Sequence, residues 1–215
     1  MTRASPPESR SGIASWMVVA AACAAFGAAW QLAHRFGIWL PNLGAALVAG
    51  GTSAWFLRSQ LRELLTPTAR DVIHGILIGI VASGGSWLLA LPASSIVPGF
   101  AFEIGSLYAV LNSPPGPLAG LPVLAMAAIS EELVFRGIVA ARLRRHLGWV
   151  QSAAVSSTIY ALPVALSGHW LLVAVALGLG SVWAVQFLRS GRLISPIISH
   201  LVWTLLVLVL FPIPS

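Results

Sequence analysis

The chain has 215 residues, of which 58% are hydrophobic and only 8% are charged. Soluble domains carry about 25% charged residues, so this composition excludes an ordinary soluble protein and indicates a polytopic membrane protein. The basic residues are all arginine and give a net charge of +6. They lie in short segments between apolar runs, which is typical of membrane topology and not of a phosphate-binding surface. We therefore expect the lipid bilayer as a partner and no nucleic acid.

The apolar runs predict an all-α transmembrane helical bundle with seven spans. The first run resembles a signal peptide, but its 21 residues exceed the usual apolar core of one, and we interpret it as a retained helix. A stretch punctuated by proline and glycine, 92–117, would raise the count to eight if it held an interfacial or re-entrant helix. In chain order, the seven spans are 13–33, 38–57, 72–91, 118–141, 149–166, 169–188 and 193–211.

The arginines predict the orientation of this bundle. With the N-terminus in the cytoplasm, ten arginines fall in cytoplasmic segments and only Arg35 falls outside. Basic residues concentrate on the cytoplasmic side of membrane proteins, so we expect the C-terminus outside, in a bacterial-type inner membrane. The predicted organisation is a cytoplasmic tail (1–12), N-terminal helices with an extracytoplasmic loop (13–117) and a core of helices (118–211).

Three charged residues lie inside the fourth apolar run: Glu131, Glu132 and Arg136. Each charge at the bilayer centre costs about 2.5–3.5 kcal/mol, so such residues are expected to face protein or water and to mark a functional site. Glu132 and Arg136 are four residues apart and can pair on one helix face. Glu131 lies about 100° around the helix and has no partner there. We expect a structural pair that holds a reactive Glu131, which is a candidate general base.

Polar residues on two other spans lie at a similar depth. Counted from the cytoplasmic boundary at the helical rise, Glu131 lies about 16 Å into the membrane, His200 about 12 Å and Tyr160 about 18 Å. Thr204 follows His200 by four residues and shares its face. The sequence therefore predicts a polar pocket in the inner half of the membrane.

These residues carry a resemblance to a known family. The segment 130–137, SEELVFRG, matches the EExxxR motif of the CAAX-protease and bacteriocin-processing (CPBP, or Abi) intramembrane endopeptidases, and 178–203 resembles their third motif region. The sequence of this second segment is also similar to that of bacterial sorting-type, myxosortase-like members of the family. The resemblance implies a catalytic core in 118–211 that hydrolyses a peptide bond of a membrane-anchored protein substrate.

The resemblance also implies roles for individual residues. Glu131 would activate water, with Glu132 and Arg136 as its supporting pair. His200 would help to activate water or stabilise the oxyanion. The family is described both as metalloproteases and as metal-independent glutamic proteases.

Two motif positions depart from the family pattern. Where the family has FxxxH, this chain has Tyr160-Ala-Leu-Pro-Val164, with valine in place of histidine. The last motif, usually HxxxN or HxxxD, ends here in Thr204. The nearest spare imidazole, His169, lies at the outer end of its predicted span.

These departures bear on the cofactor. A catalytic zinc usually takes three protein ligands, and among Glu131, Glu132 and His200 the second is already paired. We therefore expect no cofactor and disfavour zinc. In the favoured site Glu131 activates water, and His200 and Thr204 donate hydrogen bonds to the oxyanion.

The absent histidine leaves an alternative open, a catalytically degenerate family member that acts as a membrane scaffold, partner or immunity protein. Retention of both Glu131 and His200 favours the enzyme. A small transporter ranks last because charged residues occur on only one span. The sequence predicts no oligomeric state and no particular substrate.

Overall fold

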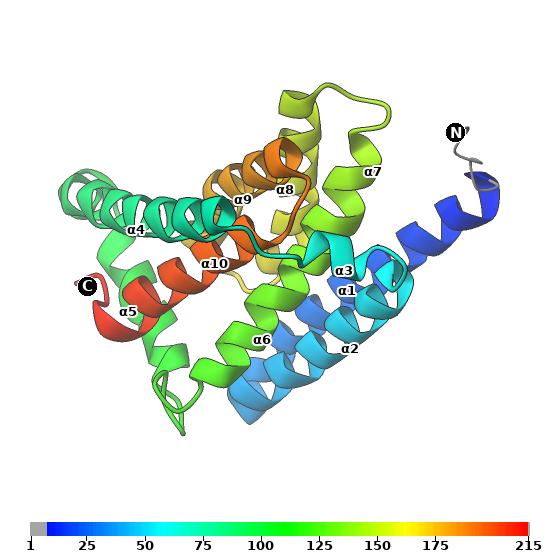
Figure 1. Ribbon diagram of the computed structural model, residues 1–215. Coiled ribbons are helices and arrows are strands. Elements are labelled where there is room, and N and C mark those ends of the chain that lie inside the picture. Colours follow the sequence, from blue (N-terminus) through cyan, green and yellow to red (C-terminus); the bar gives the residue numbers. More distant parts are fainter. Residues whose placement is uncertain (1–7, 215) are drawn as a thin grey trace.

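The computed structural model describes residues 8–214, which form helices and no β-strand. This confirms the predicted all-α fold. In chain order (Figure 1) the elements are α1 (Glu8–Phe36), α2 (Trp39–Leu57), α3 (Leu61–Leu64), α4 (Ala69–Ile96), α5 (Phe100–Leu111), α6 (Leu121–Glu131), the π-helix η1 (Glu132–Ala140), α7 (Ala141–Leu143), α8 (Trp149–Ala165), α9 (Trp170–Ser190), α10 (Ile194–Trp203) and the π-helix η2 (Thr204–Leu210).

Each predicted span corresponds to a helix or to an interrupted helical run. The fourth span is the run α6–η1–α7 and the seventh is α10–η2. By length and composition, α1, α4 and α9 can cross a membrane, which indicates that the protein is integrated into one. The total number of spans stays a prediction.

The structure differs from the sequence prediction at several boundaries. Helix α4 continues to Ile96 with Pro92 inside it, so the third span is longer than 72–91. The punctuated stretch contains α5, whose 12 residues are fewer than the about 20 that a spanning helix needs. Helix α1 already begins at Glu8, so the predicted tail 1–12 is partly helical, and its first seven residues lie outside the described part of the chain.

The bundle is centred on η1. All nine of its residues are buried, because α1, α2, α8 and α9 pack around it. In Figure 1, α1, α2 and α6 lie side by side on one flank, and α4 lies along α10 on the other. The charged motif therefore lies inside protein and not against lipid, as its cost in a bilayer predicts.

Two glycines of α4 bring it against α10. An added Cβ at Gly75 would lie 2.7 Å from the Cβ of Ile198, and one at Gly79 would lie 2.6 Å from the Cβ of Val202. The two glycines lie one turn apart on the same face of α4. Because they carry no Cβ, the two backbones can approach this closely. The contact fixes the position of the helix that carries His200.

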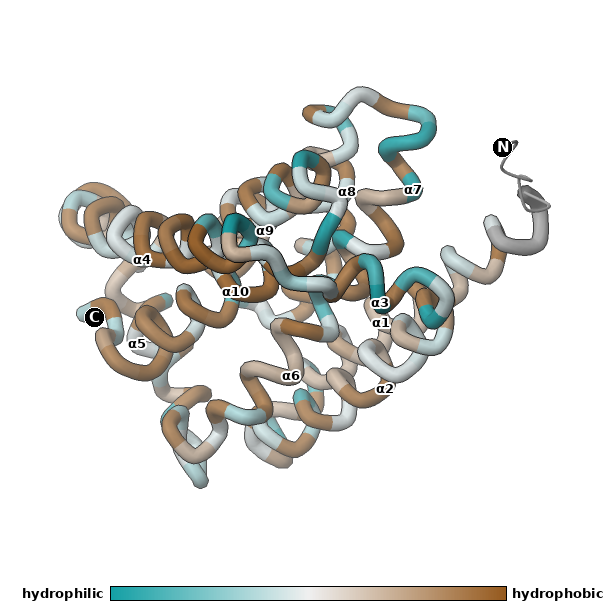
Figure 2. The backbone as a smooth tube through the Cα atoms, viewed as in Figure 1, coloured by the Kyte–Doolittle hydropathy of each residue, from teal (hydrophilic) through white to brown (hydrophobic). Residues whose placement is uncertain are grey.

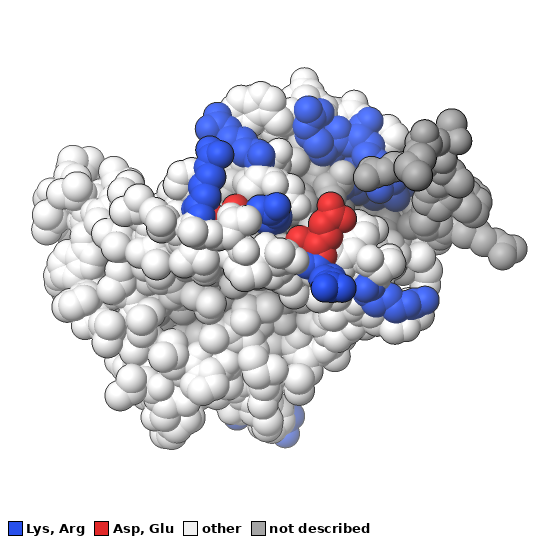
Figure 3. All heavy atoms as spheres, in the orientation of Figure 1, with Lys and Arg blue, Asp and Glu red and all other residues white. Residues whose placement is uncertain are grey.

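The outer surface is apolar around the bundle and basic at one end. Figure 2 shows α4 as hydrophobic along most of its length, and Ile73, Leu77, Ile80 and Val81 on it are exposed. Contact with lipid explains such an unpartnered apolar face. Figure 3 shows basic side chains gathered at one end of the molecule, with a small basic patch at the opposite end.

Candidate active site

The predicted site residues meet at two points where the backbone changes from α-helix to π-helix. Glu131 ends α6 and Glu132 begins η1, while Thr204 begins η2 directly after α10, which carries His200. In a π-helix each N–H donates its hydrogen bond to the carbonyl five residues earlier instead of four, and such segments occur frequently at functional sites. Both helices therefore shift their side-chain register at the site.

Glu132 is fully buried and contacts two partners. Its Oε1 lies 2.9 Å from Nδ1 of His200, and its Oε2 lies 3.3 Å from Nε of Arg136. The predicted Glu132–Arg136 pair is thus present in the structure. Nε and Oε2 are not aligned for a hydrogen bond, so charge attraction holds this pair. The bond to His200 was not expected from the sequence, and it makes Glu132 a bridge between η1 and α10.

Arg136 is also fully buried and is enclosed by α8 and α9. One terminal nitrogen donates to the carbonyl oxygen of Gly180 at 2.9 Å. The guanidinium carbon lies 4.7 Å from the ring centre of Tyr160 and 5.4 Å from that of Trp183. Aromatic faces stabilise a desolvated cation. The arginine therefore links η1, α8 and α9 around one buried charge pair.

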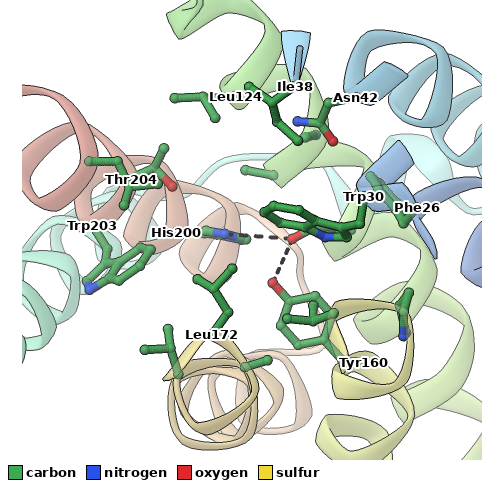
Figure 4. A pocket seen from close by; sticks show the side chains of 18 of the residues that line it. Phe26, Trp30, Ile38, Asn42, Leu124, Tyr160, Leu172, His200, Trp203 and Thr204 are labelled. Carbon is green, nitrogen blue, oxygen red and sulfur yellow. Dashed lines mark hydrogen bonds and ion pairs between the residues drawn. The ribbon is translucent and has the colours of Figure 1, made fainter. Parts of the chain in front are cut away.

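Glu131 has different surroundings from its neighbour. Tyr160 donates its hydroxyl hydrogen to Oε2 of Glu131 at 2.7 Å, and Nε2 of His200 lies 3.8 Å from the same oxygen (Figure 4). A separation of 3.8 Å is longer than a direct hydrogen bond. The Glu131 side chain is 18% exposed, whereas that of Glu132 is 0% exposed. Glu131 is therefore the carboxylate that an incoming molecule can reach.

The ring of His200 is held on two sides. Trp183 stacks on it with centroids 3.7 Å apart and planes inclined by 17°. Because a carboxylate only accepts hydrogen bonds, the contact with Glu132 assigns a hydrogen to Nδ1. The other nitrogen, Nε2, then faces Glu131 and donates a hydrogen bond only when the ring is an imidazolium.

A cavity of about 140 Å³ opens beside Glu131. One water needs about 10–15 Å³ of such volume, so the cavity has room for water and for part of a substrate. Its polar lining comes from five different helical segments, and the rest of its wall is apolar (Figure 4). The polar side chains that line it are those of Asn42, Glu131, Tyr160, His200 and Thr204.

Thr204 lies on the cavity wall and is 4% exposed. Within the described residues its hydroxyl makes no hydrogen bond, whereas Ser83, Ser152 and Ser157 each bond the carbonyl four residues earlier in their own helices. The hydroxyl is therefore available to a molecule in the cavity.

Two predicted features have a clear place as well. Val164, at the position of the family's histidine, lines the cavity. A histidine at this position would therefore lie on the wall of the same cavity as Glu131. His169 does not line this cavity. Its Nδ1 instead lies 3.2 Å from Oε2 of Glu103 on α5.

Sequence reasoning missed two contributions to the site. Asn42 on α2 lines the cavity, and the available signal was that it is the only carboxamide in its apolar run. The sequence predicted Tyr160 as a member of the polar pocket, but its bond to Glu131 depends on how α8 packs against α6. No spacing within one helix indicates that distance.

The donor set does not fit a catalytic zinc. In the part of the chain that the structure describes, no group of three His, Cys, Asp or Glu residues is arranged to hold a metal ion. Both oxygens of Glu132 face His200 and Arg136. Glu131 and Nε2 of His200 remain, one ligand fewer than the three that catalytic zinc usually takes.

Comparison with known proteins agrees with the motifs. Residues 112–206 match the family model described as type II CAAX prenyl endopeptidase Rce1-like. This match supports the resemblance of that part of the chain to the CPBP family. The matched segment contains Glu131, Glu132, Arg136, His200 and Thr204. The description of this family model names an endopeptidase, and the long apolar helices α1, α4 and α9 indicate integration into a membrane.

A more distant relative is an uncharacterized 24.3 kDa protein of Escherichia coli, 26% identical over 144 residues. The alignment covers 66% of this chain and 62% of that protein, so the chain spans less than two thirds of the length of this relative. No solved structure matches this chain.

Proposed function

We propose that this CPBP-type protein is an intramembrane endopeptidase that hydrolyses a peptide bond of a membrane-anchored protein substrate in the cavity beside Glu131. The observation that carries the proposal is the contrast between a cavity-facing Glu131 with two polar neighbours and a fully buried Glu132. A general base must reach its substrate, and its supports must not move.

In the proposed reaction Glu131 accepts a proton from a water molecule in the cavity. The water oxygen forms a bond to the carbonyl carbon, and the carbonyl oxygen becomes an oxyanion. Nε2–H of His200 and the hydroxyl of Thr204 donate hydrogen bonds to that oxyanion. The proton then moves from Glu131 to the amide nitrogen, the C–N bond breaks, and an amine and a carboxylic acid leave.

The buried pair gives His200 its role. With Nδ1–H donated to Glu132, the ring can donate a hydrogen bond from Nε2 to an oxyanion only as an imidazolium. Glu132 also contacts Arg136, so removal of Arg136 would disturb the carboxylate that holds His200.

Tyr160 compensates in part for the missing histidine. Its hydroxyl donates to Glu131 at 2.7 Å and holds the carboxylate toward the cavity. Asn42 adds an amide to the same wall. We propose that the reaction needs no metal. We also propose that the N-terminus lies in the cytoplasm, as the arginines predict, and that the substrate is one of the sorting type.

A second candidate function rests on Val164. Because this apolar side chain lines the cavity where the family has histidine, the protein would be a catalytically degenerate member that acts as a membrane scaffold, partner or immunity protein. It would then bind the same anchored proteins without cutting them.

Co-expression with tagged, membrane-anchored candidate substrates separates the two. We expect a shortened substrate band with the wild type, none with Glu131→Gln, and an unchanged band with Glu63→Gln, since Glu63 is exposed and outside the cavity. No cleavage across a broad substrate set would favour the scaffold. Inhibition by a strong zinc chelator that added zinc reverses would contradict the metal-free reaction.

A further inference from the structure

A second, larger cavity lies at the basic end of the molecule, away from Glu131. It is a cleft of about 690 Å³ between the first turns of α4, the last turns of α9 and the start of α10. None of the residues that line the catalytic cavity lines this cleft. Figure 3 shows the basic side chains gathered on this face, above α4.

The charges around the cleft are unbalanced. Arg70, Arg189 and Arg192 line it with a single acid, Asp71. Asp71 is buried and lies 3.2 Å from a terminal nitrogen of Arg192, so that arginine is already paired. Within the described residues no ion pair involves Arg70 or Arg189, and both are exposed. The cleft therefore presents two positive charges to a ligand.

A buried amide also points to a ligand. Gln186 lines the cleft and is only 8% exposed. Its Oε1 accepts a hydrogen bond from Ser199, but its Nε2 has no partner among the described residues. An unpaired buried N–H₂ group costs about 1–3 kcal/mol. An anion that accepts from Nε2 would remove this cost, whereas a cation would not.

The rest of the wall is apolar. Ile78 of α4 and Val182 and Val185 of α9 line the cleft one to two turns away from the arginines. The adjacent face of α4 carries the exposed Ile73 and Leu77. A ligand that fills this space has an anionic end and an apolar body. A free inorganic anion would use only the first of these.

We propose that the cleft binds the phosphate headgroup of an anionic membrane lipid, with Arg70, Arg189 and Gln186 as donors to the phosphate oxygens and the apolar wall against an acyl chain. Arginine suits phosphate because its planar donors bind two oxygens at once. Lys/Arg groups near a membrane surface attract anionic lipids electrostatically. The site is separate from the cavity of the proposed protease and does not depend on cleavage.

The test uses the purified full chain in dodecylmaltoside, with its thermal unfolding followed by tryptophan emission. Dioleoylphosphatidylglycerol, dioleoylphosphatidylcholine and potassium phosphate are titrated separately. A ligand that binds the folded state raises the unfolding temperature in a saturable manner. We expect this from phosphatidylglycerol, with a much smaller effect from the other two.

The variants locate the effect. Arg70→Gln combined with Arg189→Gln should raise the apparent dissociation constant for phosphatidylglycerol at least about tenfold, since two charge-assisted hydrogen bonds are lost. The matched control, Arg144→Gln with Arg145→Gln, removes two exposed arginines outside the cleft and should leave it unchanged. Gln186→Glu keeps the acceptor for Ser199, removes the donor and should weaken binding as well.

Three outcomes would overturn the proposal. Equal losses in the control and cleft variants would show unspecific attraction to a basic surface. Equal affinity for phosphatidylcholine would remove the need for an anion. Affinity for inorganic phosphate equal to that for the lipid, lost in the same cleft variants, would assign the cleft to a free anion.

Discussion

The two carboxylates at the α6–η1 junction are neighbours in the chain, and their surroundings are opposite. Glu132 lies in a buried network with Arg136 and His200, and none of its side-chain surface is exposed. Glu131 faces a cavity and bonds the hydroxyl of Tyr160. Adjacent positions on a helix differ by about 100°, so one turn of backbone carries both the acid that we propose to be reactive and the acid that we propose to be structural. The variants below should separate these two sides.

The largest effect is expected on the cavity side. Glu131→Gln removes the general base and should lower the rate of substrate cleavage about 10²–10⁴-fold, with little change in the unfolding temperature. Cleavage by purified protein in detergent, beside thermal unfolding, checks both. A variant that unfolds easily but still cleaves would reverse the roles assigned to the two acids.

On the network side stability should change first. Arg136→Ala leaves Glu132 without its cation in a fully buried place, which should cost about 3–5 kcal/mol of folding free energy. Folded yield and thermal unfolding in detergent measure this. The comparison is Arg62→Ala, since Arg62 is exposed and in no described ion pair. Equal stability of the two variants would contradict a structural role for the pair.

Thr204 tests the proposed oxyanion donors. Thr204→Val keeps the shape and removes the hydroxyl, and should lower the rate about 10²–10³-fold, as loss of one such donor does. Thr204→Ser retains the hydroxyl and should retain most of the rate. If valine and serine behaved alike in steady-state cleavage assays, the donor would have to be another group, with Asn42 the next on the same wall.

The smallest effect is expected for Tyr160→Phe. One hydrogen bond to Glu131 is lost, which is worth about 0.5–1.5 kcal/mol and corresponds to a rate about 2- to 10-fold lower. The same change at Tyr108 removes a bond to the carbonyl of Val207 outside the catalytic cavity. It should lower stability and leave the rate per folded molecule unchanged.

Much of this arrangement could be predicted from the sequence because it depends on single helices. The spacing of Glu132 and Arg136 sets their pairing, and apolar length predicted the helices that carry His200 and Thr204. The free-energy cost of a charged side chain in lipid was enough to predict that the motif lies inside the protein.

The remainder depends on how helices pack, and no periodicity encodes that. The bond between His200 and Glu132 joins residues 68 positions apart. The local sequence likewise gave no signal of the π-helical register that begins at Thr204. Asn42 reaches the cavity only because α2 lies beside α6.

The glycine contact between α4 and α10 has a consequence for how a substrate enters. With the backbone carbonyl of Ser195 only 2.9 Å from where a Cβ of Gly75 would be, the two helices are in close backbone contact over a full turn. If the protein is the protease that we propose, its polypeptide substrate cannot pass between α4 and α10. The substrate would have to enter from the lipid between other helices of the bundle.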